Sequence, residues 1–233
     1  MKKDLKERIE TLAKLLFKSR YPVFFTGAGI STESGLPDFR GPDGMWTRRD
    51  KGLAPKPGRP WDSVGPNSGH MALAELQKMG KLKFLISQNV DNLHLKSGIR
   101  PDLLAELHGN LNKLRCLRCG ETYEKSSGKS TCPCGGTLTS SVVDFGQSLP
   151  EKDLFLSYEY SRKSDLFVVV GSSLVVTPAA DMPREALHAG AKLVIINRES
   201  TNCDSLADIV INNSAGPTMA AVVAEVQRIM SDR

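Results

Sequence analysis

The chain has 233 residues, of which 40% are hydrophobic and 24% charged, a balance typical of a globular protein with one large domain or one domain carrying a small insertion. No apolar run reaches the roughly 18 residues that span a membrane. The charged start lacks the apolar core of a secretory signal, so we expect a cytoplasmic protein. The net charge of +5, from 31 basic and 26 acidic residues, indicates solubility more than an acidic partner.

The first two predicted elements are a helix and a buried strand. Leu5, Ile9, Leu12 and Leu16 recur at helical spacing and predict a helix over residues 3–19. The apolar run 21–26 predicts a strand, and a Gly-x-Gly loop follows it directly. Such glycines let the backbone turn tightly toward a pyrophosphate, and N–H groups at a following helix start bind the anion. Thr32 stands where a third glycine is usual, so an ordinary turn also fits this pattern.

The next segments alternate between loop, helix and strand. Residues 47–66 are rich in Gly, Pro and Lys and predict a long functional loop. Residues 67–79 predict a helix with Ser68 as its N-cap, and His70 near its start is expected to be structural. The predicted strand 82–87 runs into polar residues at the strand end, where open α/β sheets place ligand contacts. A surface loop is the alternative there.

A histidine follows a short helix predicted over residues 101–107, which begins with a favourable proline. This residue, His108, has the side chain whose ordinary pKa, about 6.5, suits proton removal near neutral pH. An isolated histidine is otherwise more often structural.

Four of the five cysteines lie close together in the sequence, at Cys116, Cys119, Cys132 and Cys134. A disulfide framework would be spread through a small secreted chain, so the cluster favours a structural zinc held by four thiolates. The Cys132-x-Cys134 spacing is tighter than the usual Cys-x-x-Cys and would distort the site, and free thiols are the alternative. Cys203 is treated as incidental.

The last third of the chain again alternates strands and helices. Strands are predicted at 141–147, 165–170, 193–196 and 209–211. Helices are predicted at 150–161, after the motif that ends at residue 178 as far as about residue 189, and at 218–230. The alternation predicts a parallel sheet covered by helices on both faces. The expected fold class is α/β: a Rossmann-like parallel sheet with a smaller zinc-binding lobe inserted. The expected domains are a large one (1–46, 70–110 and 141–233), a loop and helical part of the small lobe (47–69) and a zinc ribbon (111–140).

Several motifs resemble those of the sirtuins and occur in family order over nearly the whole chain. They are Gly27-Ala28-Gly29-Ile30-Ser31 with Ser34-Gly35-Leu36-Pro37-Asp38-Phe39-Arg40-Gly41, Ser87-Gln88-Asn89-Val90-Asp91, Glu106-Leu107-His108-Gly109, the cysteine pairs, Val142-Val143-Asp144-Phe145-Gly146 and Gly171-Ser172-Ser173-Leu174. The segments 40–46 and 52–55 look most like class IV sirtuins. The Tyr-x-x-Arg pair of desuccinylases is missing, so desuccinylation is not predicted.

The resemblance implies an NAD-dependent protein-lysine deacylase, acting on acetyl or long-chain acyl groups and releasing nicotinamide, O-acyl-ADP-ribose and free lysine. By resemblance, His108 is the general base, and Asn89 and Asp91 serve the nicotinamide and its ribose. Trp46 would lie against the cofactor or anchor its loop. The implied NAD-binding residues are Gly27, Ala28, Gly29, Thr32, Asp38, Phe39, Arg40, Trp46, Gln88, Asn89, Val90, Asp91, His108, Gly171, Ser172, Ser173, Asn197, Glu199 and Ala215. Val143, Phe145 and Gly146 are expected to bind the acyl-lysine peptide by strand addition.

Two other functions fit parts of the pattern. One is a protein mono-ADP-ribosyltransferase, which shares nicotinamide cleavage but transfers ADP-ribose to its target. The other is a non-enzymatic NAD- or nucleic-acid-binding module, against which the combination of His108, Asn89 and Asp91 argues. We therefore expect NAD as co-substrate, one structural zinc and an acyl-lysine protein or peptide as partner. Neither nucleic acid nor a membrane is predicted as a partner, and the oligomeric state is left open.

Overall fold

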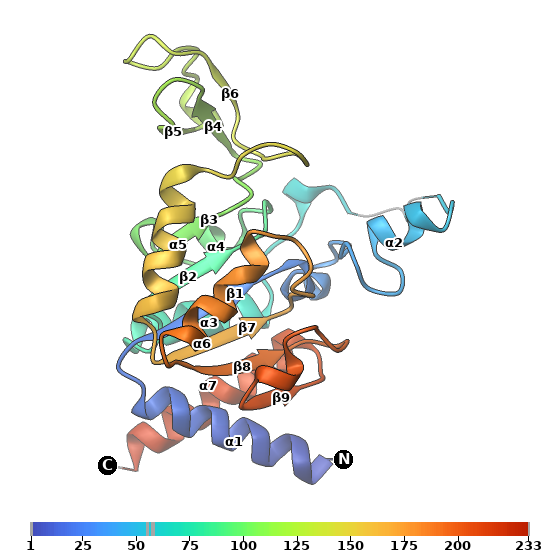
Figure 1. The fold of residues 1–233 in the computed structure, drawn as a ribbon, viewed down its shortest axis with the longest axis vertical. Helices are drawn as coiled ribbons and strands as arrows, with labels where there is room; N and C mark the ends of the chain where they lie inside the picture. Colours follow the sequence, from blue (N-terminus) through green and yellow to red (C-terminus); the bar gives the residue numbers. More distant parts are fainter. Residues whose placement is uncertain (1, 55, 57–58, 233) are drawn as a thin grey trace.

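A six-stranded parallel sheet forms the centre of the computed structural model, which describes residues 2–54, 56 and 59–232 (Figure 1). Its strand order is β3-β2-β1-β7-β8-β9. The strands are β1 (Pro22–Thr26), β2 (Phe84–Ser87), β3 (Leu104–Glu106), β7 (Leu166–Val170), β8 (Lys192–Ile196) and β9 (Ile209–Ile211). The parallel sheet with helices on both faces confirms the predicted fold class.

The strands are buried on both faces, which explains their nearly continuous apolar sequence. In β1, the side chain of Phe24 packs into one core, and those of Val23 and Phe25 pack into the other. All three residues are fully buried. In the neighbouring β7, Val168 and Val169 divide between the two cores in the same way.

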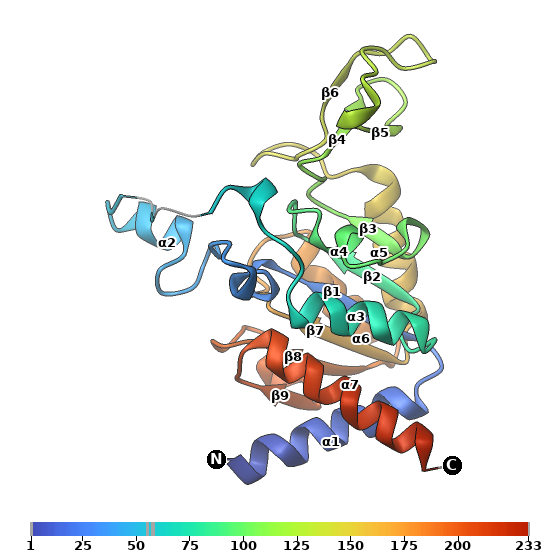
Figure 2. The same cartoon turned by 180° about the vertical axis from the view of Figure 1, so that it is seen from behind.

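Two helical layers cover the sheet (Figures 1 and 2). The cluster on one face takes side chains from α1 (Lys2–Lys18), α3 (Ser68–Lys78) and α7 (Ala215–Ser231). The cluster on the other face takes them from α5 (Glu151–Lys163) and α6 (Met182–His188). Among the described residues, none of the helices combines the length and the apolar character that a membrane span requires.

A small antiparallel sheet forms a separate lobe at the end of the molecule farthest from α1 (Figure 1). Its order is β5-β4-β6, from β4 (Lys113–Cys116), β5 (Thr122–Glu124) and β6 (Leu138–Ser140). All three strands fall within the range predicted for the zinc ribbon, 111–140. The domain boundaries themselves stay predictions.

Two predicted elements are wrong. Residues 101–107 form a 3₁₀ turn, Pro101–Leu103, followed by strand β3, because the buried Leu104 and Ala105 pair with β2 at the edge of the sheet. Residues 141–147 form no strand. Within this segment, the N–H of Val143 donates to the carbonyl oxygen of His108 at 3.0 Å.

Smaller differences concern the helix ends and the long loop. Asn67, rather than Ser68, caps α3, because its side chain accepts the N–H of Gly69 at 2.8 Å and His70 completes a capping box. Helix α7 begins at Ala215, which was expected in a loop. The expected loop contains α2 (Met45–Asp50) and a 3₁₀ turn, Trp61–Ser63. A further short helix is α4 (Leu93–Lys96). Pro55, part of the segment compared with class IV, lies outside the described residues.

Candidate active site

A cavity of about 1120 Å³ lies at the carboxyl ends of the parallel strands. The strand order corresponds to that of the dinucleotide-binding folds, in which ligands bind where the order reverses, here between β1 and β7. Loops that follow β1, β2, β3, β7 and β8 all contribute to the cavity wall. Segments far apart in the sequence therefore meet at one site.

Every residue assigned to NAD or to the peptide lines this cavity. The cofactor set consists of Gly27, Ala28, Gly29, Thr32, Asp38, Phe39, Arg40, Trp46, Gln88, Asn89, Val90, Asp91, His108, Gly171, Ser172, Ser173, Asn197, Glu199 and Ala215. The peptide set, Val143, Phe145 and Gly146, lies on the same wall. The sequence could not show this convergence, because it depends on how segments from distant parts of the chain pack together.

The glycine loop after β1 makes a close backbone contact with the loop after β7. The N–H of Gly29 donates to the carbonyl oxygen of Gly171 at 2.8 Å. A Cβ atom on Gly29 would lie 2.7 Å from that oxygen, so a larger residue cannot stand there without movement. The turn that follows is a 3₁₀ helix, Ala28–Ile30, rather than the α-helix of the dinucleotide pattern. Packing against the loop after β7 therefore requires a glycine at position 29, and the same lack of a side chain would let a pyrophosphate approach the backbone.

Asn89 and Asp91 meet on one hydroxyl, that of Ser31. The Ser31 hydroxyl donates to Asp91 Oδ2 at 2.6 Å and accepts from Asn89 Nδ2 at 3.2 Å. Asp91 Oδ1 accepts the N–H of Leu93 at 2.9 Å. Both polar residues are buried, at 8% and 5% exposure, and burial raises the pKa of Asp91. The network fixes an amide and a carboxylate side by side in a buried part of the cavity.

Two buried histidines, His70 and His94, lie next to this network. The N–H of Asn67 donates to His70 Nδ1 at 3.3 Å, so His70 Nε2 carries the proton and faces the Ser31 hydroxyl at 3.4 Å. The ring of His94 lies 5.1 Å from that of His70, and its Nε2 is 2.8 Å from the Thr26 hydroxyl. Burial lowers the pKa of His70 to about 4 and that of His94 well below its ordinary value. His70 is thus a structural hydrogen-bonding residue in this chain, as expected.

His108 is held in one tautomer by the backbone of the neighbouring loop. Its Nδ1 lies 2.9 Å from the carbonyl oxygen of Gln88. A carbonyl oxygen only accepts, so Nδ1 carries the proton and Nε2 keeps a free lone pair. Burial lowers the pKa of His108, although the bond to Gln88 opposes this shift. His108 is therefore neutral and can accept a proton near neutral pH.

The loops after β7 and β8 supply small polar groups to the other part of the cavity. The Ser172 hydroxyl accepts from Gln88 Nε2 at 2.7 Å, which joins the loops after β2 and β7. Asn197 Nδ2 donates to the carbonyl oxygen of Glu199 at 2.9 Å. Ala215 is buried at the first turn of α7 and lines the cavity. These groups suit the hydroxyls and heterocycle of an adenosine.

Trp46 anchors its own loop, and its expected contact with the cofactor stays a prediction. It lines the cavity, and its ring stacks on Phe39 with centroids 5.9 Å apart. It also packs edge-on against the Phe145 ring, with the ring centroids 5.3 Å apart, and the Arg49 guanidinium carbon lies 4.5 Å from the Trp46 ring centroid. Phe145 itself is 68% exposed. Trp46 thus links the loop after β1 to the segment after β6.

A second cavity of about 510 Å³ adjoins the first and shares four wall residues with it: Phe39, Trp61, Val90 and Asp91. We call it the side chamber. Its remaining walls are Leu111, Asn112 and Lys96. Trp61 and Leu111, like Ser31, were not among the predicted site residues. Ser31 and Leu111 lie within or beside quoted motifs, but nothing in the sequence separates Trp61 from its Pro-rich loop.

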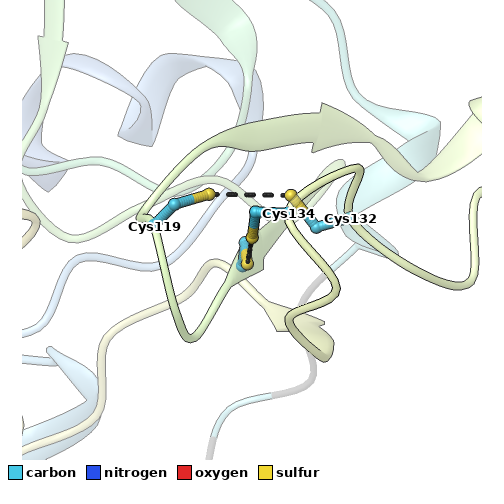
Figure 3. A group of neighbouring side chains, drawn as sticks. Cys119, Cys132 and Cys134 are labelled. Atoms are coloured by element: carbon cyan, nitrogen blue, oxygen red, sulfur yellow. Dashed lines mark hydrogen bonds between the residues drawn. The ribbon is translucent and has the colours of Figure 1, made fainter.

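The four clustered cysteines fit a tetrahedral metal. Their sulfurs all lie within 4.8 Å of one another, with Cys116 and Cys134 at 3.5 Å and Cys119 and Cys132 at 3.6 Å (Figure 3). Zn–S bonds of about 2.3 Å place tetrahedral sulfurs about 3.8 Å apart, far beyond a disulfide bond. A Cβ on Gly136 would lie 2.5 Å from Cys116 Sγ, so a glycine is needed beside the cluster. The tight Cys132-x-Cys134 pair therefore does not prevent the four sulfurs from converging on a zinc ion.

The chain matches the model of the Sir2 family over residues 27–59 and 53–178. It is 41% identical to NAD-dependent protein deacylase 2 of Archaeoglobus fulgidus, over 98% of this chain and 100% of that protein. It is 40% identical to NAD-dependent protein deacetylase 1 of Bradyrhizobium diazoefficiens, over 94% and 97% of the two chains. A solved structure, that of Sir2Af2 bound to a myristoylated histone peptide, has a TM-score of 0.73 and 38% identity, covering 97% of this chain and 99% of that one.

Proposed function

The chain belongs to the Sir2 family, and we infer that it is an NAD-dependent protein-lysine deacylase in which His108 is the general base. NAD is the co-substrate that accepts the acyl group from lysine, and the products are nicotinamide, O-acyl-ADP-ribose and free lysine. The observation that carries the role of His108 is its 2.9 Å hydrogen bond to the Gln88 carbonyl inside the large cavity.

His108 is suited to take a proton from a ribose hydroxyl. The Gln88 carbonyl fixes the proton on Nδ1 and leaves Nε2 as the acceptor. The N–H of Val143 is bonded to the carbonyl oxygen of His108 at 3.0 Å, so the segment proposed for peptide binding is attached to the backbone of the base. This contact would place the acyl-lysine next to the group that takes the proton.

Asn89 and Asp91 are proposed to hold the nicotinamide end of NAD. A carboxamide needs both a donor and an acceptor, and a buried amide next to a carboxylate supplies both. The Ser31 hydroxyl bonds to both side chains and keeps them in place. The glycine loop and Ser172, Ser173 and Asn197 would hold the phosphates and the adenosine.

We propose that the side chamber receives the tail of a long acyl group. Val90 belongs to the loop of Asn89 and Asp91, and Leu111 lies three residues beyond His108. We therefore expect a chain that leaves the reacting carbonyl beside His108 to extend into the chamber. Phe39, Trp61, Val90 and Leu111 offer apolar walls, which favour methylene groups by roughly 0.8 kcal/mol each. Sir2Af2, which is similar to this chain, has been solved with a myristoylated histone peptide.

The decisive experiment measures nicotinamide release from NAD with a panel of acyl-lysine peptides and follows the peptides by mass spectrometry. Deacylation lowers the peptide mass by the acyl group, whereas ADP-ribosylation raises it. Release that depends on the acyl peptide and matches its deacylation supports the proposal. A heavier peptide would replace it with ADP-ribosylation, and no release from zinc-loaded protein would overturn the enzymatic assignment.

The side chamber is tested separately with a filling variant, Leu111→Trp. It should lower kcat/KM for a myristoyl peptide by more than about tenfold and leave acetyl-peptide turnover nearly unchanged, because several methylene contacts are lost. Leu117→Trp, at a site 67% exposed on the zinc lobe, is the control. Equal loss for both peptides would contradict the chamber without touching deacylation itself.

We also propose a cytoplasmic location and membership of class IV. None of the five cysteines forms a disulfide in the part of the chain that the structure describes, and four of them gather as a metal site, which suits a reducing compartment. The class rests on the resemblance of residues 40–46 and 52–55 to class IV sirtuins. Fractionation of the native cells tests the location.

A further inference from the structure

The zinc lobe has a polar side chain directed at one of its cysteines that belongs to neither cysteine pair. The hydroxyl of Tyr123 lies 3.3 Å from Cys132 Sγ. Among the described residues, Cys132 alone of the four cysteines has a hydroxyl partner. The other side-chain partners recorded for these sulfurs are the cysteines themselves.

The position of Tyr123 is fixed by the small sheet rather than by a mobile loop. Tyr123 lies in the middle of β5 and pairs with Leu114 of β4. Its strand neighbours, Thr122 and Glu124, are exposed, whereas Tyr123 is half-buried. The ring therefore faces the cysteines on the inner side of the strand.

A charged group strengthens this hydroxyl as a donor. Lys129 Nζ lies 4.4 Å from the centroid of the Tyr123 ring. A cation over an aromatic face attracts its electrons and makes the phenol a better hydrogen-bond donor. The positive charge also partly offsets a site in which four thiolates outweigh the two charges of a zinc ion.

We propose that Tyr123 is an outer-shell positioning residue of the zinc site, whose hydroxyl donates to the Cys132 thiolate and slows zinc release, with Lys129 assisting through the ring. A metal-bound thiolate has no proton, so the phenol is the donor of this bond. Outer-shell hydrogen bonds fix a ligand's orientation and spread its charge. The bond acts at the first residue of the tight Cys132-x-Cys134 pair.

The test compares zinc-loaded wild type with Tyr123→Phe, which keeps the ring and removes only the hydroxyl. Zinc transfer to a chromophoric chelator should become about tenfold faster, because outer-shell partners contribute about tenfold or more to metal affinity and this one acts on release. Tyr158→Phe, on α5 of the large domain, should match the wild type. Lys129→Met keeps the phenol and should give an intermediate rate of release.

A spectroscopic readout separates an electronic role from packing. In cadmium-substituted protein, the cadmium NMR resonance should move in Tyr123→Phe, because a thiolate that loses a hydrogen bond donates more electron density to the metal. It should stay in place in Tyr158→Phe. Unchanged zinc transfer in Tyr123→Phe, or faster transfer with an unmoved cadmium resonance, would overturn the proposal. Neither readout depends on deacylase activity.

Discussion

Glu106 and Lys113 form an ion pair that joins the two sheets, with Lys113 Nζ 2.6 Å from Glu106 Oε2. Glu106 ends β3 of the large sheet, two residues before His108, and Lys113 begins β4 of the zinc lobe. Both side chains are largely buried, at 13% and 16% exposure. Asn110, on the connecting segment, also donates to the Glu106 carboxylate at 2.5 Å. The pair therefore holds the segment that carries His108 between the two lobes.

Lys113→Met should destabilise the protein by about 3 kcal/mol near neutral pH, because it leaves the Glu106 carboxylate buried without its cation. Burial already raises the pKa of Glu106, and Lys113 opposes this shift. Without the lysine, the pKa of Glu106 in the folded state rises further above its unfolded value. The loss of stability in the variant therefore shrinks as the pH falls toward the folded pKa of Glu106. Urea unfolding at about pH 8 and about pH 5.5 measures both effects. Lys163→Met, which breaks an exposed pair with Glu159, should change stability by less than about 1 kcal/mol. A pH-independent deficit would contradict the assigned cause.

The pH dependence of kcat/KM should report the lowered pKa of His108. A base acts only when unprotonated, so activity should fall as pH drops through a value below 6.5. His108→Ala should remove most deacylation and still bind ADP-ribose, as calorimetry would show. Normal turnover in this variant, or an acid limb centred above 7, would exclude His108 as the base.

Asn89→Ala should lose nicotinamide exchange in the presence of acyl peptide by about a hundredfold, the effect of removing one well-placed donor. The same change removes the hydrogen bond to Ser31 and another to the Gly27 carbonyl at 3.2 Å. A thermal shift with ADP-ribose, which lacks nicotinamide, should persist. Exchange at the wild-type rate would argue against a nicotinamide role.

Acid should destabilise the protein through His70. Its pKa is about 4 in the folded state and about 6.5 when unfolded, so its stabilising effect is complete above pH 6.5 and is lost as pH falls toward 4. The loss amounts to about 3 kcal/mol over that window. His70→Gln should flatten the profile measured by urea unfolding, whereas His188→Gln, at an exposed end of α6, should not. Parallel profiles for all three proteins would refute this assignment.

Zinc removal should unfold the small lobe and spare the large sheet, because the three short strands of the lobe have little apolar core of their own. Hydrogen exchange after chelation should show protection lost over residues 113–140 and kept in β1 and β7. Metal analysis confirms that the sample is zinc-free. Full deacylase activity in that sample would refute a structural role for zinc.

The sequence by itself determined five of the six strands of the large sheet, most helices, the parallel order of the sheet and most of the polar residues that line the cavity. Buried parallel strands leave long apolar runs, and the polar residues that follow them mark the ligand edge of the sheet. The cysteine spacing likewise indicated the metal. These signals are local, so they can be read along the chain.

The tertiary structure alone decided how these parts act together. Residues 104–106 form a strand because β2 offers them an edge, and residues 141–147 form none because no described strand pairs with them. The tautomer of His108 depends on a carbonyl twenty positions away in the sequence, and the network of Ser31 depends on two loops that meet only in space. The contact of Tyr123 with Cys132 and the side chamber of Trp61 and Leu111 arise in the same way, from long-range packing that no local pattern encodes.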